Sequence, residues 1–336
     1  MNGEELRRTW GCVGVGLVLL LTNNGCAQAT VQQLPLVHQL PALLDSEMRI
    51  FGEIRGTTVQ QSNRKMDVLV KQAAPRTRFP RSFAPFCNLY KQESVMATLP
   101  RRALIAITSY NEPFYADGKR TGLFFTEALH PFQVFTQAGI AVDLASENGT
   151  FGFDEHSLSP EFAKPADQAV LHNPSHPFML KLQQLRRANQ LDPSQYGLFF
   201  ASAGHGSLYD YPQADLLQRI AGNIWKQGGI VSAVCHGPAI LPGIVDSQTG
   251  RSIIAGRAVT GFTTEGEILL NVLEKIKADN VPTIEEGAAK VGAKYLAPLH
   301  PFDDFSLTDG RLVTGANPAS AHSTAERAVK AFEGLA

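Results

Sequence analysis

The chain has 336 residues, of which 44% are hydrophobic and 18% charged, and its formal net charge at pH 7 is -1. That length and composition suffice for one large globular domain with additions, or for two ordinary domains. The near-neutral charge gives no electrostatic basis for a nucleic-acid partner, and four scattered cysteines exclude a disulfide scaffold and a Cys-x-x-Cys zinc site.

The first 29 residues have the layout of a secretory signal peptide. Two arginines precede an uncharged run at 10–21, which is followed by an Ala-Gln-Ala triplet that ends at Ala29. The run is too short to span a bilayer comfortably. We therefore predict cleavage after Ala29 and export to the periplasm or the medium. A lipid anchor on Cys26, an uncleaved membrane anchor, or a misassigned start that would leave the protein in the cytoplasm remain alternatives.

Residues 30–100 differ in composition from the rest of the chain. This stretch is rich in Gln, Pro and Arg, and nine basic side chains outnumber five acidic ones. The segment PRTRFPRSFAP at 75–85 is typical of an extended linker. We predict an N-terminal extension or linker, partly disordered, that precedes a single domain at 101–336.

From residue 101 onward, short apolar runs alternate with helical periodicity. The apolar runs predict strands at 103–108, 140–144, 196–201, 229–234 and 312–314. The periodic segments predict helices at 121–137, 174–189, 213–227, 264–279, 283–294 and 323–335. This alternation predicts an α/β fold with parallel strands and helices on both faces of the sheet. In such sheets, sites form at the carboxyl ends of the strands.

Cys235 is the candidate nucleophile. It lies in GGIVSAVCHGPAI (228–240), where a buried-strand pattern meets His-Gly-Pro, a sequence that suits a helix start. A cysteine at such a corner would lie near unpaired helix amides, which can lower its pKa and favour the thiolate. The alternative is an inert buried cysteine. For Cys87, in the N-terminal extension, we predict no role.

Two further elements can assist a nucleophile at this corner. The backbone amide of His236 can serve as one oxyanion-hole donor, since the residue after an elbow nucleophile commonly supplies one. The loop of Gly204, His205 and Gly206 follows another predicted strand and can supply the second. Alternatively, these glycines form only a turn. The His236 imidazole needs a third group to orient it before it can act as a base.

Seven colinear stretches carry a family resemblance. They are SYNE at 109–112, GLFFTEALHPF at 122–132, FASAGHG at 200–206, AVCHGPA at 233–239, GFTTEGE at 261–267, AKYLAP at 293–298 and DGRLVTGANPASAHSTA at 309–325. Together they resemble the PfpI/ThiJ (class I glutamine amidotransferase-like) superfamily, most closely its branch of heat-inducible chaperones that are also glutathione-independent glyoxalases of the glyoxalase III type. The resemblance implies a flavodoxin-like, doubly wound domain that is usually dimeric.

The resemblance also implies roles for four residues. By position, Cys235 is the nucleophile, His236 its histidine, Glu267 the acidic partner, and Glu127 the helix-borne glutamate that hydrogen-bonds the thiol and moves protons. Glu127 lies among apolar residues, where a carboxyl tends to have a raised pKa that suits an acid or base. The alternatives are a solvated helix glutamate for Glu127, and for Glu267 an acid that complements the helix dipole.

The activity implied is the conversion of methylglyoxal, or a similar 2-oxoaldehyde, to D-lactate (D-lactate dehydratase activity), with no cofactor. We also predict no metal, because His130, His205 and His300 show no tight ligand spacing. The expected partners are the small 2-oxoaldehyde, a second copy of the chain and unfolded client proteins. Two alternative functions remain: a holdase chaperone or redox stress protein, and a Cys-His-Glu amidohydrolase or peptidase.

Overall fold

The computed structural model describes residues 7–12, 15–21, 27–32 and 99–335, and the chain divides into two units, 1–93 and 94–336. In the first unit, β1 (Arg7–Cys12), β2 (Val15–Leu21) and β3 (Ala27–Gln32) form an antiparallel sheet. The signal peptide predicted over this stretch stays a prediction, and most of the predicted extension at 30–100 lies outside the described residues. In the described ranges, no helix is both long and apolar enough to span a bilayer.

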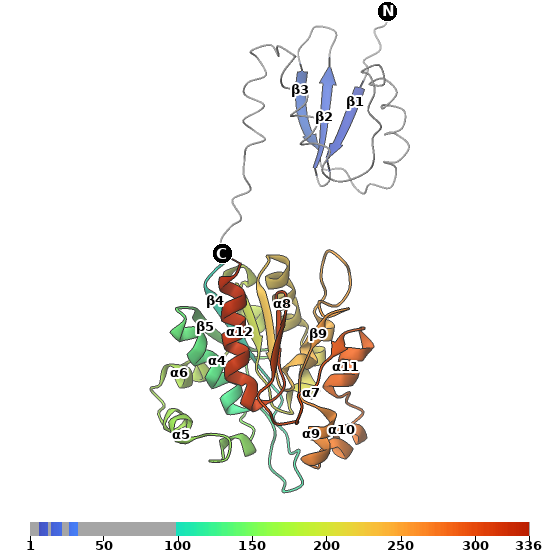
Figure 1. Cartoon of the computed structure of the whole chain (residues 1–336). Helices are drawn as coiled ribbons and strands as arrows, with labels where there is room; N and C mark the ends of the chain where they lie inside the picture. Colours follow the sequence, from blue (N-terminus) through green and yellow to red (C-terminus); the bar gives the residue numbers. More distant parts are fainter. Residues whose placement is uncertain (1–6, 13–14, 22–26, 33–98, 336) are drawn as a thin grey trace, which may run out of the picture. The chain divides into compact units, whose positions relative to one another are not determined.

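The second unit is built on a seven-stranded sheet (Figure 1). Its order is β11-β12-β8-β7-β4-β5-β6, and all neighbouring strands are parallel except the β11–β12 pair. The strands are β4 (Arg102–Ile107), β5 (Ala141–Ser146), β6 (Arg186–Arg187), β7 (Leu198–Ala201), β8 (Ile230–Val234), β11 (Ser306–Asp309) and β12 (Leu312–Gly315). The sheet grows outward in both directions from β4, so the predicted doubly wound α/β fold is confirmed.

The central strands are buried on both faces, which explains their continuous apolar runs. Every residue of β7 (LFFA) and β8 (IVSAV) is buried, as are all but the first of β4. Strands that are covered on both sides need no polar alternation. These are therefore the strands that the sequence predicts most sharply.

Helices cover both faces of this sheet. On one face, α4 (Phe125–Gln137) lies against α12 (Ala321–Glu333), as Figure 1 shows, and both contribute to one apolar core. On the other face, α8 (Asp215–Lys226) buries Leu217, Ile220, Ala221 and Ile224, whose spacing places them on one side of a helix.

Shorter elements complete the unit. The α-helices are α5 (Pro165–Leu171), α6 (Pro177–Gln183), α7 (Ser207–Asp210), α9 (Thr264–Leu269), α10 (Leu273–Ala278) and α11 (Ile284–Lys290). The 3-10 helices are η2 (His156–Leu158), η3 (Ala188–Gln190), η4 (Pro193–Gln195), η5 (Tyr211–Gln213), η6 (Gly237–Gly243) and η7 (Pro318–Ser320). A two-stranded parallel sheet pairs β9 (Ala258–Val259) with β10 (Lys294–Tyr295). Figure 1 shows α7, α9 and α10 together at the lower end of this unit.

Four predicted helices have clearly different bounds in the structure. The helix predicted at 283–294 ends as α11 at Lys290, before β10 begins at Lys294. The helix predicted at 264–279 is two helices, because Asn271 between them has a left-handed φ of 56°. The helix predicted at 121–137 begins only at Phe125, since Leu123 instead pairs with the extended backbone at Phe153. The helix predicted at 174–189 keeps only α6 and then gives way to β6.

Candidate active site

Cys235 lies on a strained corner at the carboxyl end of β8. Its φ is 57°, a left-handed conformation that side chains other than glycine rarely adopt. Two backbone hydrogen bonds hold it there: its amide donates to the Gly315 carbonyl at 2.9 Å, and its carbonyl accepts from the Phe262 amide at 2.8 Å. At Gly237, a Cβ atom would overlap the Ala201 carbonyl oxygen. The predicted corner is therefore confirmed, although the 3-10 helix η6 follows it instead of an α-helix.

The side chains of Cys235, His236 and Glu267 form a hydrogen-bonded triad. The Cys235 Sγ atom lies 3.2 Å from His236 Nδ1, and His236 Nε2 lies 2.8 Å from Glu267 Oε1. Glu267 lies in the first turn of α9, a helix whose start is capped by the Thr263 hydroxyl, which accepts from the Gly266 amide. The geometry thus places a thiol, an imidazole and a carboxylate in the order that nucleophilic catalysis by a cysteine needs.

The environment sets the charge state of the base and its carboxylate. Burial alone would raise the pKa of Glu267, but the imidazoles of His236 and His205 lower it to about 2, so Glu267 is ionised. Burial, reinforced by the nearby His205, lowers the pKa of His236. A neutral His236 that donates Nε2–H to Glu267 presents the lone pair of Nδ1 to the sulfur. It is therefore ready to accept the thiol proton.

Glu127 is fully buried near the start of α4. Neither of its carboxyl oxygens has a hydrogen bond of ordinary geometry to any residue in the described part of the chain. Burial raises its pKa well above the usual value, and the neighbouring Cys235 thiol opposes this only partly. Glu127 is thus a buried carboxyl with a raised affinity for protons, beside the Cys235 thiol.

The pKa of Cys235 is shifted in the direction opposite to our prediction. Burial raises it well above the ordinary value, and the negative charge that Glu127 can carry raises it further. The backbone amide of His236 lowers it, but does not reverse the shift. The backbone amides at this corner therefore do not outweigh burial, because Cys235 is only 3% exposed and its thiol adjoins the Glu127 carboxyl. His236 Nδ1, 3.2 Å from the sulfur, is placed to accept the thiol proton.

The groups of the predicted oxyanion hole differ in whether they already have hydrogen-bond partners in the protein. Among residues 99–335, the amides of Gly204 and His236 donate to no backbone carbonyl, and the His236 amide contacts the Cys235 thiol. The amide of Gly206, in contrast, donates to Thr121 Oγ1 at 3.1 Å. The ring of His205 binds Glu267 Oε2 through Nε2 at 2.9 Å. For Gly206 and the His205 side chain, the contacts therefore favour structural roles over the predicted one.

We predict that Gly204→Ala damages this loop. Gly204 has a φ of 133°, and an added Cβ would overlap the Gly122 carbonyl oxygen. The free energy of unfolding should fall by about 1–3 kcal/mol, as measured by urea denaturation. Gly118→Ala is the matched control: its φ of 82° is also left-handed, but a Cβ there meets no atom within 4 Å. An equal loss in both variants would mean that backbone strain alone is responsible.

His205 joins the triad, a contact that the sequence did not predict. Donor atoms of His205, His236 and Glu267 lie within 4.8 Å of one another, a spacing at which three such side chains can also hold a metal ion. Here direct hydrogen bonds of 2.8 and 2.9 Å already join the two Nε2 atoms to the carboxylate. Of the other histidines weighed as metal ligands, His130 pairs with Asp167, and His300 is exposed. The place of His205 after β7, the strand next to β8, was the available signal.

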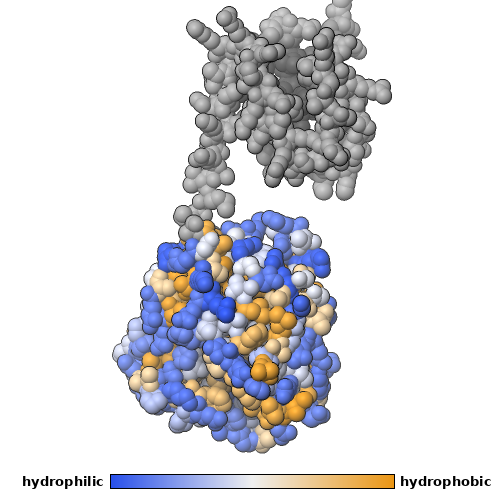
Figure 2. Space-filling model, in the orientation of Figure 1, coloured by the Kyte–Doolittle hydropathy of each residue, from blue (hydrophilic) through white to orange (hydrophobic). Residues whose placement is uncertain are grey.

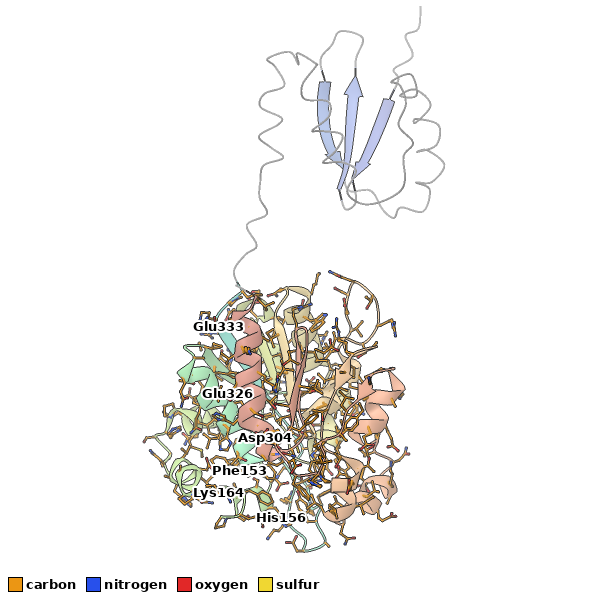
Figure 3. The ribbon with its side chains drawn as sticks, in the orientation of Figure 1. Phe153, His156, Lys164, Asp304, Glu326 and Glu333 are labelled. Carbon is orange, nitrogen blue, oxygen red and sulfur yellow. The ribbon has the colours of Figure 1, made fainter. Side chains whose placement is uncertain are left out.

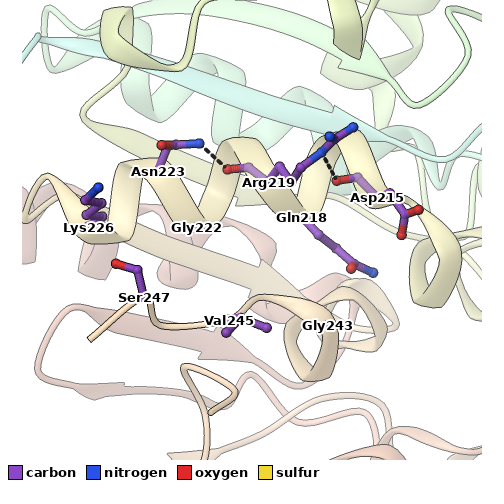
Figure 4. Close-up of a pocket in the computed structure, with 9 residues that line it drawn as sticks. All are labelled: Asp215, Gln218, Arg219, Gly222, Asn223, Lys226, Gly243, Val245 and Ser247. Carbon is purple, nitrogen blue, oxygen red and sulfur yellow. Dashed lines mark hydrogen bonds between the residues drawn. The ribbon is translucent and has the colours of Figure 1, made fainter. Parts of the chain in front are cut away.

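A separate groove lies on the outer side of α8 (Figure 4). It has a volume of about 470 Å³ and is lined by α8 and by the chain around Gly243, Val245 and Ser247. Its charged lining residues are Asp215, Arg219 and Lys226, and neither the triad nor Glu127 belongs to it. The chemistry at Cys235 therefore does not use this groove.

Comparisons with known proteins place the chain in a family. No family model matches the sequence. The chain is 52% identical over 234 residues to the glutathione-independent glyoxalase HSP31 of Saccharomyces cerevisiae, covering 70% of this chain and 99% of that protein. It is 51% identical over 232 residues to Glyoxalase 3 of Candida albicans, covering 69% and 98%. The crystal structure of glyoxalase III from Candida albicans superposes with a TM-score of 0.68 at 50% identity, covering 70% and 98%. The chain therefore belongs to the glutathione-independent glyoxalase family, of the glyoxalase III type.

Proposed function

We propose that this protein converts methylglyoxal, or a similarly small 2-oxoaldehyde, to D-lactate without glutathione or any other cofactor. The observation that carries the proposal is the buried cysteine between two different proton acceptors, His236 at 3.2 Å and the otherwise unpartnered Glu127. Access to a sulfur that is only 3% exposed favours a very small substrate. The names of the glyoxalase relatives support the same assignment.

The first step forms a carbon–sulfur bond. His236 takes the Cys235 proton as the sulfur attacks the aldehyde carbon, and a hemithioacetal oxygen develops negative charge. The amides of His236 and Gly204, which donate to no backbone carbonyl, are available to stabilise that oxygen. A protonated Glu127 can then give its proton to the oxygen, which leaves a carboxylate beside the former aldehyde carbon.

The second step moves hydrogen between the two carbons. The Glu127 carboxylate takes the proton from the first carbon, and the protonated His236 gives its proton to the second oxygen, so that an enediol forms. Glu127 then returns its proton to the second carbon and takes the hydroxyl proton of the first oxygen. The product is a lactoyl thioester on Cys235, which water cleaves to lactate and the free thiol. One carbon is oxidised as its neighbour is reduced, so the balance needs no external oxidant or reductant. His236 and Glu267 are placed to activate that water.

The direct test is turnover of methylglyoxal by the purified full chain in the absence of glutathione. We expect a product that D-lactate dehydrogenase oxidises and L-lactate dehydrogenase does not. Chromogenic amide and ester substrates should not be cleaved at a comparable rate. Rapid amide cleavage without lactate formation would instead favour the amidohydrolase alternative.

A holdase role is the second candidate, and exposed apolar side chains favour it. Ile268, Leu269 and Leu270, at the end of α9 beside the triad carboxylate, are 59%, 61% and 42% exposed. Figure 2 shows orange surface at the lower right, the region where Figure 1 places α9 and α10. Such a surface suits an unfolded client or the second subunit of a homodimer. Suppression of aggregation that persists when lactate formation is abolished would support the client role.

We propose, finally, that the chain is exported and cleaved after Ala29. The basic start, the short apolar run and the Ala-Gln-Ala triplet support this proposal. Mass spectrometry of the protein purified from its native source should then find Thr30 at the mature N-terminus. A lipid on Cys26 would show an anchored form, and a retained start would favour an uncleaved membrane anchor or a cytoplasmic protein.

A further inference from the structure

A continuous chain of hydrogen bonds extends from Cys235 through the triad to Asp154. Beyond Glu267, the chain passes to His205 Nε2 at 2.9 Å. His205 Nδ1 lies 3.1 Å from the Tyr115 hydroxyl, which donates to Asp154 Oδ2 at 2.7 Å. With the two triad contacts, five hydrogen bonds join six side chains in series. Five bonds in series require five protons, one for each contact.

The ordinary charge states of these six side chains supply only four. The thiol, the tyrosine hydroxyl and two neutral imidazoles carry one each, and the two carboxylates carry none. One contact in the series would then place two acceptors against each other at hydrogen-bond distance, in a buried site where an unmade hydrogen bond is costly. The chain of contacts therefore holds one additional proton.

The neighbouring groups indicate where that proton resides. Asp154 accepts from the Ser157 amide, the Thr121 hydroxyl and the Tyr115 hydroxyl, which is the pattern of a carboxylate. The pKa of Glu267 is lowered to about 2, so this carboxyl is ionised as well. Burial lowers the pKa of His236, which leaves this imidazole neutral. His205 alone can then donate from both ring nitrogens.

We propose that His205 is a buried imidazolium, held by Tyr115 and Asp154 on one side and by Glu267 on the other, and that it positions the triad. It touches neither the sulfur nor the substrate in this scheme. Its positive charge balances the carboxylate of Glu267, which orients His236. The same charge disfavours protonation of His236 by solvent, so that His236 is neutral when the thiol gives up its proton. The titratable groups that face or adjoin it are Glu267, His236, Tyr115, Asp154 and His156.

The surroundings keep the His205 ring in place. Phe114 stacks on it with ring centroids 4.9 Å apart, and Phe262 meets it edge-on at 5.9 Å. His156 stacks on Tyr115 at a centroid separation of 4.0 Å. Figure 3 labels His156 at the lower end of the domain, opposite Glu333. The outer end of the hydrogen-bond chain thus approaches the surface, because His156 is partly exposed.

The test is nitrogen-15 NMR of the histidine-labelled full chain at about pH 7, where an unperturbed histidine is mostly neutral. Both ring nitrogens of His205 should give protonated shifts, and His236 should give one protonated and one unprotonated nitrogen. Comparison with His205→Gln identifies the signals, and His205→Asn does so if the first variant does not fold. A neutral His205 would overturn the proposal. Because the measurement needs no turnover, its outcome is independent of glyoxalase activity.

Kinetics give a second readout that rests on the proposed function. Without the neighbouring cation, His236 should protonate more readily, so the acid limb of the kcat/KM profile should move to higher pH in His205→Gln. We expect kcat/KM to fall about tenfold or more at about pH 6, with substantial recovery above about pH 8. Tyr115→Phe, which removes the acceptor for Nδ1–H, should shift the same limb. His172→Gln, at an exposed helix end, is the control. A loss that is equal at every pH would contradict the positioning role.

Discussion

Replacing Cys235 with serine should lower kcat/KM for methylglyoxal by at least about a thousandfold. The reason is the match between the thiol and its base. His236 is neutral and lies 3.2 Å from the sulfur, and an imidazole of lowered pKa can accept a proton from a thiol but much less readily from an alcohol. The measurement is the initial rate of lactate formation by wild type and variant.

The control for this variant is Cys87→Ser. Cys87 lies outside the described residues and outside the stretches that resemble the family, so its replacement should leave the rate unchanged. Serine has nearly the shape of cysteine, so the Cys235→Ser variant should keep the thermal unfolding midpoint of the wild type within a few degrees. Full activity of Cys235→Ser would show that the sulfur is not the nucleophile of the reaction.

The sequence predicted the architecture because the decisive strands are buried on both faces. The runs of β7 and β8 are apolar throughout apart from Ser232, and a covered parallel sheet is the setting that suits such segments. Boundaries failed where a single backbone angle decides them. Asn271 ends one helix and permits another, and the surrounding composition gives no sign of that. Propensity summed over a window does not resolve a one-residue change of conformation.

The candidate site could be predicted only in part, for a different reason. The corner at Cys235 is local, so the strand followed by His-Gly-Pro was sufficient to find it. The partners of His205 lie at 115 and 267, and only the fold brings these residues together. The pKa of Cys235 was predicted in the wrong direction because the sequence shows neither the burial of the thiol nor the carboxyl group facing it. Charge state follows from three-dimensional surroundings and not from the residue type alone.

Glu127→Gln should abolish turnover while making Cys235 more reactive. The amide cannot carry a proton between two carbons, so lactate formation should fall by at least about a hundredfold. The same change removes the negative charge that, after burial, contributes to raising the pKa of Cys235. The thiolate is therefore more populated at a given pH in the variant. Alkylation by iodoacetamide at about pH 7 should become several-fold faster than in wild type, because the thiolate is the nucleophile.

These opposite changes separate a proton-transfer role of Glu127 from a structural one. A distorted site would lower the rate of lactate formation and could change the alkylation rate in either direction. Loss of the carboxyl alone predicts that lactate formation slows while alkylation of Cys235 becomes faster. Glu265→Gln is the matched control, since this exposed glutamate lies in the first turn of α9, as Glu127 lies in the first turn of α4. It should change neither rate. Slower alkylation in Glu127→Gln would contradict this prediction. It would mean that the Glu127 carboxyl stabilises the thiolate by donating a hydrogen bond to it. The proton shared by the two groups would then lie on Glu127 rather than on the sulfur.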